Sequence, residues 1–220
     1  MNAFIKKHEF NYIRKCLTDL SNAFTGCIDA NIIDVTKAYT QEKILSILSD
    51  LSEEQRSLLS IGNITNSSHI DAFLAELNDY VSGMPTITNS QISKLFKKEK
   101  KLKLPDGNLH ASKNVYLGWV DEAVGKLFVA YNLNGKFVGM ACRITNHTSS
   151  NAHRCVLCNR VGKEHEVAFV SPICKTANAG DGAYRSIGFN LCLDSEKCNE
   201  RITATDKLEK ILKDVNSIKD

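Results

Sequence analysis

The stretch Cys155-Val156-Leu157-Cys158 determines how the second half of this 220-residue chain is expected to fold. Two cysteines separated by two residues have the spacing of a zinc knuckle, in which both thiolates can reach one metal ion at about 2.3 Å. A second pair, Cys192 and Cys198, follows after a segment that is long enough for a β-hairpin. The spacing therefore predicts one zinc ion, with these two cysteine pairs as the first candidate ligands.

The residues between Cys192 and Cys198 indicate which element carries the last ligand. Asp194 and Ser195 are good N-cap residues, and they predict a helix that continues through Arg201. The dipole of such a helix favours the thiolate form of a cysteine near its N-terminus. A knuckle, a hairpin and a helix with the last ligand make up a treble-clef zinc finger. Four thiolates close the coordination shell, so the zinc is expected to be structural.

Other residues compete for this site. The C-x5-C spacing of the second pair is looser than the usual C-x2-C, and Cys174 is the main rival ligand, followed by His153 and His165. Cys174 lies at the end of a strand-like run, and this position favours burial of the Cys174 side chain. Cys16, Cys27 and Cys142 are interpreted as small buried apolar residues. A redox centre is disfavoured because no βαβ pattern surrounds the C-x2-C motif.

Composition places the chain among ordinary soluble proteins, with 43% hydrophobic and 24% charged residues. No segment approaches the roughly 18–20 apolar residues that span a bilayer, and residues 1–8 are too polar for a secretory signal. We therefore expect a cytoplasmic protein without a membrane partner, in which the eight cysteines form no disulfide framework. The net charge of +3 is too small to indicate nucleic acid.

Residues 1–83 have the periodicity of helices. Two clear apolar stripes are Phe10, Ile13, Leu17, Leu20 and Phe24, and Ile70, Phe73, Leu74, Leu77 and Val81. A further helix is expected from about Ala30 to Leu48, with Ile33, Ala38, Ile44, Leu45 and Leu48 inward. Ser52 and Gln55 form a capping-box signature for a short helix. Four amphipathic helices bury their stripes against each other, which predicts an antiparallel four-helix bundle.

Ser82-Gly83-Met84-Pro85 ends this pattern, because glycine and proline together interrupt a helix. We place a domain boundary here, between residues 1–83 and residues 84–220. Thr88 and Gln91 then predict a capped helix that carries Ile92, Leu95 and Phe96 and continues through the lysine-rich run 97–103 to Pro105.

Beyond Pro105 the sequence predicts strands. The expected strands are 115–120, 126–132, 137–140, 167–171 and 184–191. Asn134-Gly135 indicates a hairpin with a type I′ turn, since both residues tolerate positive φ. A final helix would bury Leu208, Ile211, Leu212, Val215 and Ile218. The fold class is thus α+β, with a four-helix bundle followed by an α/β domain that ends in a treble-clef zinc finger.

No arrangement of residues indicates catalysis. The chain has no G-x-S-x-G, Walker or H-E-x-x-H motif. Gly180-Asp181-Gly182 lacks the lysine of a phosphate loop and is interpreted as a turn, and Glu164-His165-Glu166 as a solvated trio. The lysines of 94–103 could contact RNA or an acidic protein, but a solvated helix face is favoured. We therefore expect a binding protein and no enzyme.

Four strings in one order resemble a known family. They are Tyr116-Leu117-Gly118-Trp119, the run Lys97-Lys98-x-Lys100-Lys101-Leu102-Lys103-x-Pro105, Cys155-x-x-Cys158-Asn159, and Cys192-x-Asp194-Ser195-x-x-Cys198-Asn199. Together they resemble the FusB family of fusidic acid resistance proteins, also called elongation factor G-binding proteins. Phe10-Asn11-Tyr12-Ile13-Arg14 is similar to the family's N-terminal helix.

The resemblance implies a helical bundle followed by a domain with a treble-clef zinc finger. By the family's pattern the zinc ligands are Cys155, Cys158, Cys192 and Cys198, which leaves Cys174 outside the site. Members bind elongation factor G, on or off the ribosome, and release it from the complex in which fusidic acid traps it. Direct binding of the drug is not expected, and contact with nucleic acid is not required.

The resemblance also implies where the partner binds. The family's contact region falls on the zinc-finger lobe, which here contains Phe169, Lys175, Tyr184, Arg185 and Phe189. The alternative function is a ribosome- or RNA-binding zinc protein that acts in translation without a role in resistance.

Overall fold

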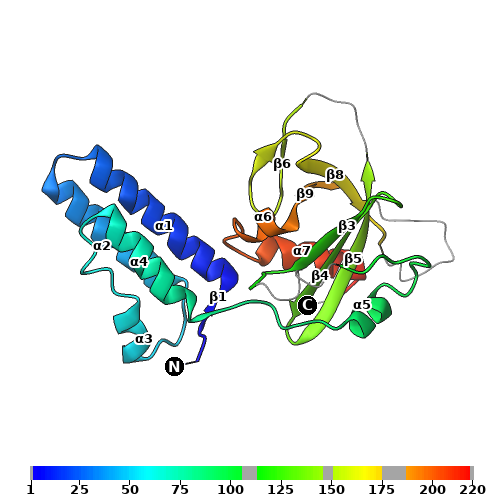
Figure 1. The fold of residues 1–220 in the computed structure, drawn as a ribbon, viewed down its shortest axis with the longest axis horizontal. Coiled ribbons are helices and arrows are strands. Elements are labelled where there is room, and N and C mark those ends of the chain that lie inside the picture. Colours follow the sequence, from blue (N-terminus) through cyan, green and yellow to red (C-terminus); the bar gives the residue numbers. More distant parts are fainter. Residues whose placement is uncertain (1, 106–112, 146–150, 175–186, 219–220) are drawn as a thin grey trace. The chain divides into compact units, whose positions relative to one another are not determined.

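The computed structural model describes residues 2–105, 113–145, 151–174 and 187–218. The chain divides into two compact units, an N-terminal unit of Met1–Ser82 and a C-terminal unit of Gly83–Asp220 (Figure 1). Among the described residues, no helix is both long and apolar enough to cross a lipid bilayer.

The N-terminal unit is a helical bundle. Its helices are α1 (Lys7–Gly26), α2 (Ala30–Ser46), α3 (Glu53–Leu58) and α4 (Ser67–Asn78). The predicted stripe of α1 is buried at Phe10, Ile13, Leu17 and Leu20. The predicted capping box opens α3, where Ser52 and Gln55 bond to each other's backbone N–H groups. Strands β1 (Ile5–Lys6) and β2 (Val81–Ser82) pair in parallel and join the two ends of the unit.

Helix α2 differs from its predicted pattern. Ala38, which was expected to face inward, is exposed, and the buried residues of α2 are Thr40 and Ile44. Large apolar side chains at Ile32, Val35 and Tyr39 are also exposed. Because apolar residues occupy more than one side of α2, their spacing alone could not identify the side that packs against the bundle.

The C-terminal unit is built on an antiparallel five-stranded sheet in the order β3-β4-β5-β8-β9. The bounds are β3 Leu117–Asp121, β4 Lys126–Leu133, β5 Lys136–Thr145, β8 Val167–Pro172 and β9 Phe189–Cys192. A separate small sheet pairs β6 (His153–Arg154) with β7 (Val161–Gly162). The helices are α5 (Asn89–Leu95), α6 (Ser195–Asn199) and α7 (Asp206–Asn216).

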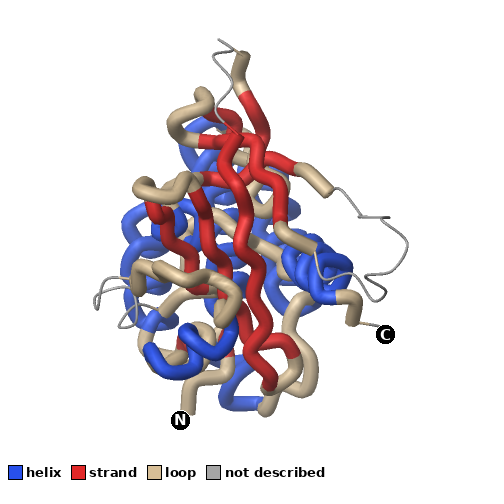
Figure 2. The backbone as a smooth tube through the Cα atoms, turned by 90° about the vertical axis from the view of Figure 1, so that its right-hand side faces the viewer, coloured by secondary structure: helices blue, strands red, loops and turns tan. Residues whose placement is uncertain are grey.

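The two faces of the sheet are covered by different helices, as the alternation along β4 requires. Leu127 and Val129 point into a core that contains Leu208, Leu212 and Val215 of α7. Phe128 and Ala130 point into a second core with Ile92 and Phe96. Helices α7 and α5 therefore pack against opposite faces of the sheet, whose strands are drawn in red in Figure 2. The α+β prediction is confirmed.

The predicted hairpin joins β4 to β5. Asn134 and Gly135 have φ of 50° and 83°, and Leu133 pairs with Lys136 across the turn. Positive φ at both central residues is what a type I′ turn requires.

The predicted continuation of the lysine-rich helix is wrong, because α5 ends at Leu95. The next residue, Phe96, is buried edge-on against Trp119 and Phe128, with ring centroids 5.5 Å and 5.2 Å away. The chain turns there to place this ring in the core, and the lysines that follow offer no apolar stripe to continue a helix. Of the predicted strand 184–191, residues 189–191 lie in β9, and residues 184–186 lie outside the described part.

Candidate metal centre

Four sulfur atoms meet at one point of the C-terminal unit. The Sγ atoms of Cys155, Cys158, Cys192 and Cys198 all lie within 4.8 Å of one another. Cys155 Sγ is 3.9 Å from Cys198 Sγ, and Cys158 Sγ is 3.5 Å from Cys192 Sγ. A tetrahedral site with Zn–S bonds of about 2.3 Å places its sulfurs about 3.8 Å apart. The cluster therefore has the size and the donor set of a structural zinc site.

The first pair lies in the turn between β6 and β7. The N–H of Cys155 donates to the Arg160 carbonyl at 2.8 Å, and the N–H of Asn159 donates to the Cys155 carbonyl at 3.0 Å. Asn159 has a φ of 60°, a left-handed conformation that asparagine tolerates. The knuckle is fixed to the sheet because the N–H of Val156 donates to the carbonyl of Asn190 in β9 at 2.9 Å.

The second pair comes from β9 and α6. Cys192 is the last residue of β9, and Cys198 lies in α6. Asp194 caps α6 by accepting from the N–H of Lys197 at 3.0 Å, as predicted. The knuckle, the strand and the capped helix form the predicted treble clef. We call β6, β7, β9 and α6, with the residues that join them at the cysteines, the zinc-finger lobe.

The four thiols of the cluster differ in pKa. Hydrogen bonds from Cys155, Cys192 and Cys198 hold the pKa of the Cys158 thiol below its ordinary value. Hydrogen bonds with Cys155 and Cys158 raise the pKa values of Cys192 and Cys198. Four thiolates at these distances repel one another, so the protein alone cannot ionise all of them. A divalent cation stabilises all four thiolates, and four cysteine sulfurs are a typical donor set for zinc.

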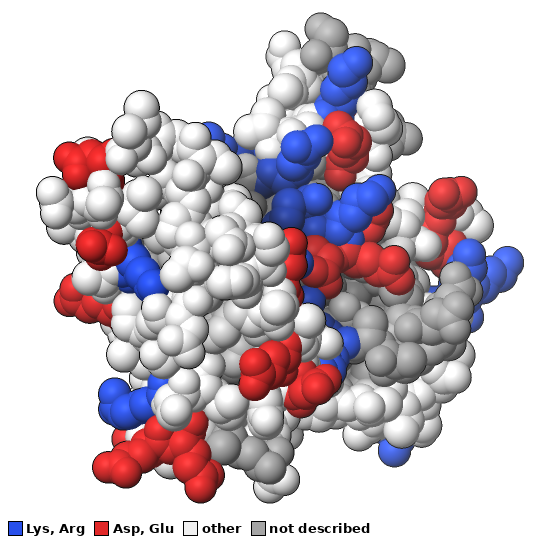
Figure 3. Space-filling model, turned by 60° about the vertical axis from the view of Figure 1, so that its left-hand side comes forward, with Lys and Arg blue, Asp and Glu red and all other residues white. Residues whose placement is uncertain are grey.

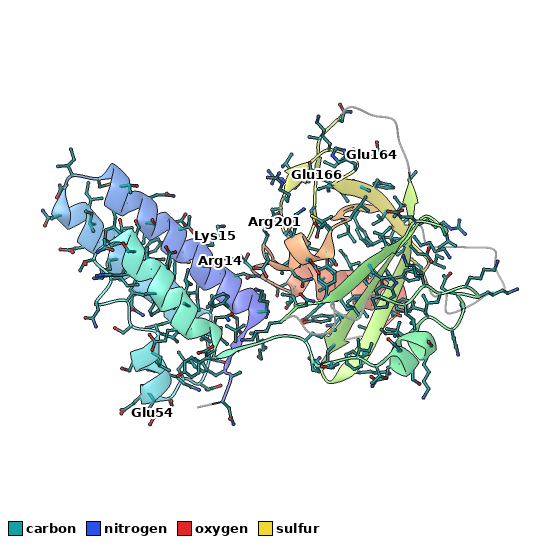
Figure 4. The ribbon with its side chains drawn as sticks, viewed as in Figure 1. Arg14, Lys15, Glu54, Glu164, Glu166 and Arg201 are labelled. Atoms are coloured by element: carbon teal, nitrogen blue, oxygen red, sulfur yellow. The ribbon has the colours of Figure 1, made fainter. Side chains whose placement is uncertain are left out.

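Two neighbouring side chains support the thiolates. Arg201, which Figure 4 labels, lies two residues after the end of α6. Its Nη2 donates to Cys192 Sγ at 3.7 Å. Tyr116 is fully buried, and burial together with the neighbouring Cys198 raises the pKa of its hydroxyl well above the ordinary value. The hydroxyl therefore stays protonated and can donate to the Cys198 sulfur. Such groups offset the net negative charge of a zinc ion with four thiolates.

We expect Arg201→Met to bind zinc about tenfold more weakly, because residues that hydrogen-bond to metal ligands typically affect affinity at that level. Competition with a chromogenic chelator measures the affinity. Arg160→Met is the matched control, since Arg160 is exposed and pairs with Glu166 at 3.9 Å. Equal zinc affinity in the two variants would contradict a role for Arg201.

The rival ligands lie elsewhere. Among the described residues the cluster contains neither Cys174 nor a histidine. His153 is half-buried in β6, and His165 is exposed in the turn before β8. Burial, with Cys174 nearby, raises the pKa of Cys142 to about 12, which agrees with an inert core thiol. Cys16 is also buried, but the predicted burial of Cys27 is wrong, because this residue is half-buried where α1 ends.

A contact between α6 and β3 was not predicted. The side chain of Asn199 accepts from the N–H groups of Val115 and Tyr116 at 2.7 Å and 3.0 Å. Its amide donates to the carbonyls of Tyr116 and Ser195 at 3.0 Å and 2.8 Å. Ser195 donates to the Gly118 carbonyl at 2.6 Å. A Cβ on Gly118 would lie 2.9 Å from that of Ser195, so only glycine permits this approach.

The predicted partner-binding residues are only partly placed. Phe169 in β8 and Phe189 in β9 are both half-buried, whereas Lys175, Tyr184 and Arg185 lie outside the described residues. Phe189 pairs with Val170, so it shares a sheet face with the core and lies on the opposite face from Phe169. Phe169 covers Gly188, at which a Cβ would lie 2.2 Å from the phenyl ring.

The charges around the zinc-finger lobe are mixed. Lys197 pairs with Asp194 at 2.9 Å, in addition to the pair between Arg160 and Glu166. The face of the molecule drawn in Figure 3 exposes basic and acidic side chains. Interleaved charges of both signs suit contact with a protein better than contact with a polyanion.

Comparison with known proteins identifies both units. Residues 4–85 match a family model described as elongation factor G-binding protein, N-terminal. Residues 87–218 match one described as FBP C-terminal treble-clef zinc-finger. A solved structure of the fusidic acid resistance protein FusC is similar, with a TM-score of 0.78 and 25% identity over 97% of this chain and 98% of that chain. No curated protein matched the sequence.

Proposed function

Because the chain belongs to the elongation factor G-binding protein family, we propose that it binds elongation factor G and promotes release of the factor from ribosomes stalled by fusidic acid. The observation that carries this proposal is the match of both units, in order, to the two domains of one family. The similarity to FusC across nearly the whole chain supports the same function.

Release requires preferential binding and no chemistry. A protein that binds the free or exit-competent conformation of the factor more tightly than the trapped one shifts the population toward release. The size of this shift is limited by the ratio of the two affinities. The closed four-thiolate site offers no position for a reacting water, so we propose that the protein acts without enzymatic activity.

The proposed contact surface is the zinc-finger lobe with its adjoining strand β8. The residues proposed to contact the factor are Phe169, Lys175, Tyr184, Arg185 and Phe189. Of the two that the structure describes, Phe169 is the better anchor, because Phe189 packs against the main core of the C-terminal unit. A partly exposed aromatic ring on a rigid strand is typical of residues that dominate binding energy.

Binding and release are tested separately. Binding is measured by isothermal titration of the purified protein with elongation factor G. Release is measured by sedimentation of ribosomes to which fusidic acid and the factor have been added. We expect saturable binding at micromolar concentration or tighter, and less factor in the ribosome pellet when the protein is added. Absence of binding would overturn the proposed function, and binding without release would overturn its mechanism.

Phe169→Ala should weaken binding to elongation factor G about tenfold. Truncation of a central aromatic contact typically costs about 1–2 kcal/mol of binding free energy, and about 1.4 kcal/mol corresponds to a tenfold change in Kd. Val124→Ala is a control at another partly exposed apolar residue, in the turn between β3 and β4. Circular dichroism establishes that both variants are folded. An unchanged affinity for Phe169→Ala would remove this residue from the contact surface.

A further inference from the structure

The segment that ends α5 and follows it exposes lysine alone. In residues 94–103 the exposed residues are Lys94, Lys97, Lys98, Lys100, Lys101 and Lys103. The other residues of this segment are buried or half-buried. We call these six residues the lysine strip. All but the first lie beyond the end of α5 at Leu95, so the solvated helix face predicted for them does not account for their arrangement.

The backbone of the lysine strip is attached to the sheet by the residues between and beside its lysines. Phe96 packs edge-on against Trp119, and Leu102 and Leu104 pack against the same hydrophobic core. The indole N–H of Trp119 donates to the Lys103 carbonyl at 2.8 Å. The cations are therefore carried by a segment with a fixed path, and such a segment loses less conformational entropy when it binds a partner.

The positive charge of the strip is not balanced within the described part of the chain. The acidic residue of this segment, Glu99, accepts from Lys126 of β4 at 2.6 Å, so its charge is compensated by a lysine outside the strip. Among the described residues, no lysine of the strip forms an ion pair with a carboxylate. Lys136 of β5 is also exposed and lines the same hollow as Lys94 and Lys98. A bound polyanion would relieve the repulsion between these like charges.

The surface of the strip suits a phosphate backbone better than a protein. Protein interfaces have an apolar centre, in which aromatic residues and arginine are enriched and lysine is depleted. Residues 94–103, all of which the structure describes, include no arginine and no exposed apolar residue. Contacts with phosphate need only a cationic or hydrogen-bonding partner, and lysine supplies both.

The same surface favours double-helical RNA over single-stranded RNA. Proteins that bind single strands stack the bases on exposed aromatic rings. The aromatic residue of this segment, Phe96, is only 5% exposed and is covered by the core. Double-helical RNA presents its phosphates without unstacked bases, and cations can contact these phosphates in any sequence.

We propose that the lysine strip is a second docking surface, which binds the phosphate backbone of double-helical ribosomal RNA. This inference rests on the proposed function, which brings the protein to ribosomes, and adds an RNA contact made by residues outside the zinc-finger lobe. Binding to ribosomal RNA would raise the effective concentration of the zinc-finger lobe near a factor trapped on the same ribosome.

The test measures binding of a fluorescein-labelled RNA duplex by fluorescence anisotropy over a series of salt concentrations. Lys98→Gln/Lys101→Gln removes two charges of the strip, and Lys207→Gln/Lys210→Gln removes two charges from exposed residues of α7. At about 0.1 M salt we expect the strip variant to raise Kd about tenfold, because each lost phosphate contact forfeits the release of a counterion. The slope of log Kd against log salt should fall by about 1.5 in the strip variant. The α7 variant should stay within about twofold of the wild type in Kd.

The RNA measurements alone can overturn the inference. Absence of binding to the duplex by the wild type would overturn it. Equal weakening in the two variants would indicate general charge attraction and would overturn the strip. Tighter binding to the single strand than to the duplex, or a strong preference between duplexes of unrelated sequence, would overturn contact with the phosphates of a double helix.

Isothermal titration with elongation factor G separates this inference from the proposed function. The strip variant should bind the factor within about twofold of the wild type, because its lysines lie outside the proposed contact surface. A strip variant that binds RNA normally and the factor weakly would show that the strip contacts the protein, and the inference would be wrong. Absence of factor binding by the wild type would overturn the proposed function, and with it the ribosomal source of the RNA.

Chemical labelling tests the contact directly. The lysines of the strip should react more slowly with an amine-reactive ester when the RNA duplex is bound, as measured by mass spectrometry of the labelled peptides. Lys207 and Lys210 of α7 are the internal controls, and their labelling should not change. Unchanged labelling of the strip at saturating RNA would exclude it as the docking surface.

Discussion

Replacement of Cys155 by serine is expected to abolish zinc binding and to unfold most of the C-terminal unit. Cys155, Cys192 and Cys198 are fully or almost fully buried and belong to the main hydrophobic core of this unit. Loss of one ligand therefore removes both the metal and a set of core contacts. The free energy of metal binding in such a lobe is also folding free energy, with apparent values of about 10–16 kcal/mol in zinc-finger peptides. A domain ordinarily has a free energy of unfolding of only about 5–15 kcal/mol. Loss of the zinc-binding free energy would therefore remove most or all of the stability of the C-terminal unit.

Zinc content by elemental analysis and thermal unfolding by circular dichroism measure this effect. The wild type should hold one zinc per chain, and Cys155→Ser should hold none and lose the cooperative transition of the C-terminal unit. Cys174→Ser is the matched control, because Cys174 is half-buried outside the cluster and contacts the Pro172 carbonyl at 3.8 Å. Zinc loss from the control, or one zinc per chain in Cys155→Ser, would contradict the ligand assignment.

Features with a local signature were predicted from the sequence. Asn134-Gly135 specifies its own turn, and Ser52 with Gln55 specifies its own helix start, because each interaction involves residues within four positions of each other. The C-x2-C spacing belongs to the same class. The family expected from the four strings is confirmed by both domain matches.

Features that depend on distant residues could not be predicted in this way. Asn199 bonds to Tyr116 across 83 positions of sequence, and an isolated asparagine carries no sign of such a partner. The end of α5 at Leu95 depends on where the ring of Phe96 packs in the core, between strands that follow it in the chain. The inward side of α2 depends on which helix it contacts.

The structure explains why two of the four strings occur together. The string at Tyr116–Trp119 supplies the backbone groups and the glycine that α6 approaches, and the string at Cys192–Asn199 supplies the serine and asparagine that bond to them. Tyr116 also connects the two strings through its hydroxyl, which neighbours the Cys198 sulfur. The sequence motif is therefore one structural unit that attaches the zinc-finger helix to the sheet.

Replacement of Asn199 by alanine is expected to destabilise the C-terminal unit by about 4 kcal/mol, the second-largest effect. Asn199 is 1% exposed, and its side chain makes four hydrogen bonds. Alanine would leave the N–H groups of Val115 and Tyr116 buried without their acceptor, at a cost of about 1–3 kcal/mol for each buried group. The vacated volume adds a smaller cost, and single substitutions above about 4 kcal/mol are rare.

Chemical denaturation measures this loss, with zinc content determined on the same samples. Asn216→Ala is the control, because Asn216 also bonds to two carbonyls but is only half-buried, so water can replace it at a cost of about 1 kcal/mol. Folded Asn199→Ala should still hold one zinc per chain, since Asn199 is not a ligand, and this separates its effect from that of Cys155→Ser. An equal, small loss of stability in both asparagine variants would show that α6 does not depend on Asn199 for its attachment to β3. A large loss that appears only at Asn199 would identify this side chain as the main polar link between the zinc-finger helix and the sheet.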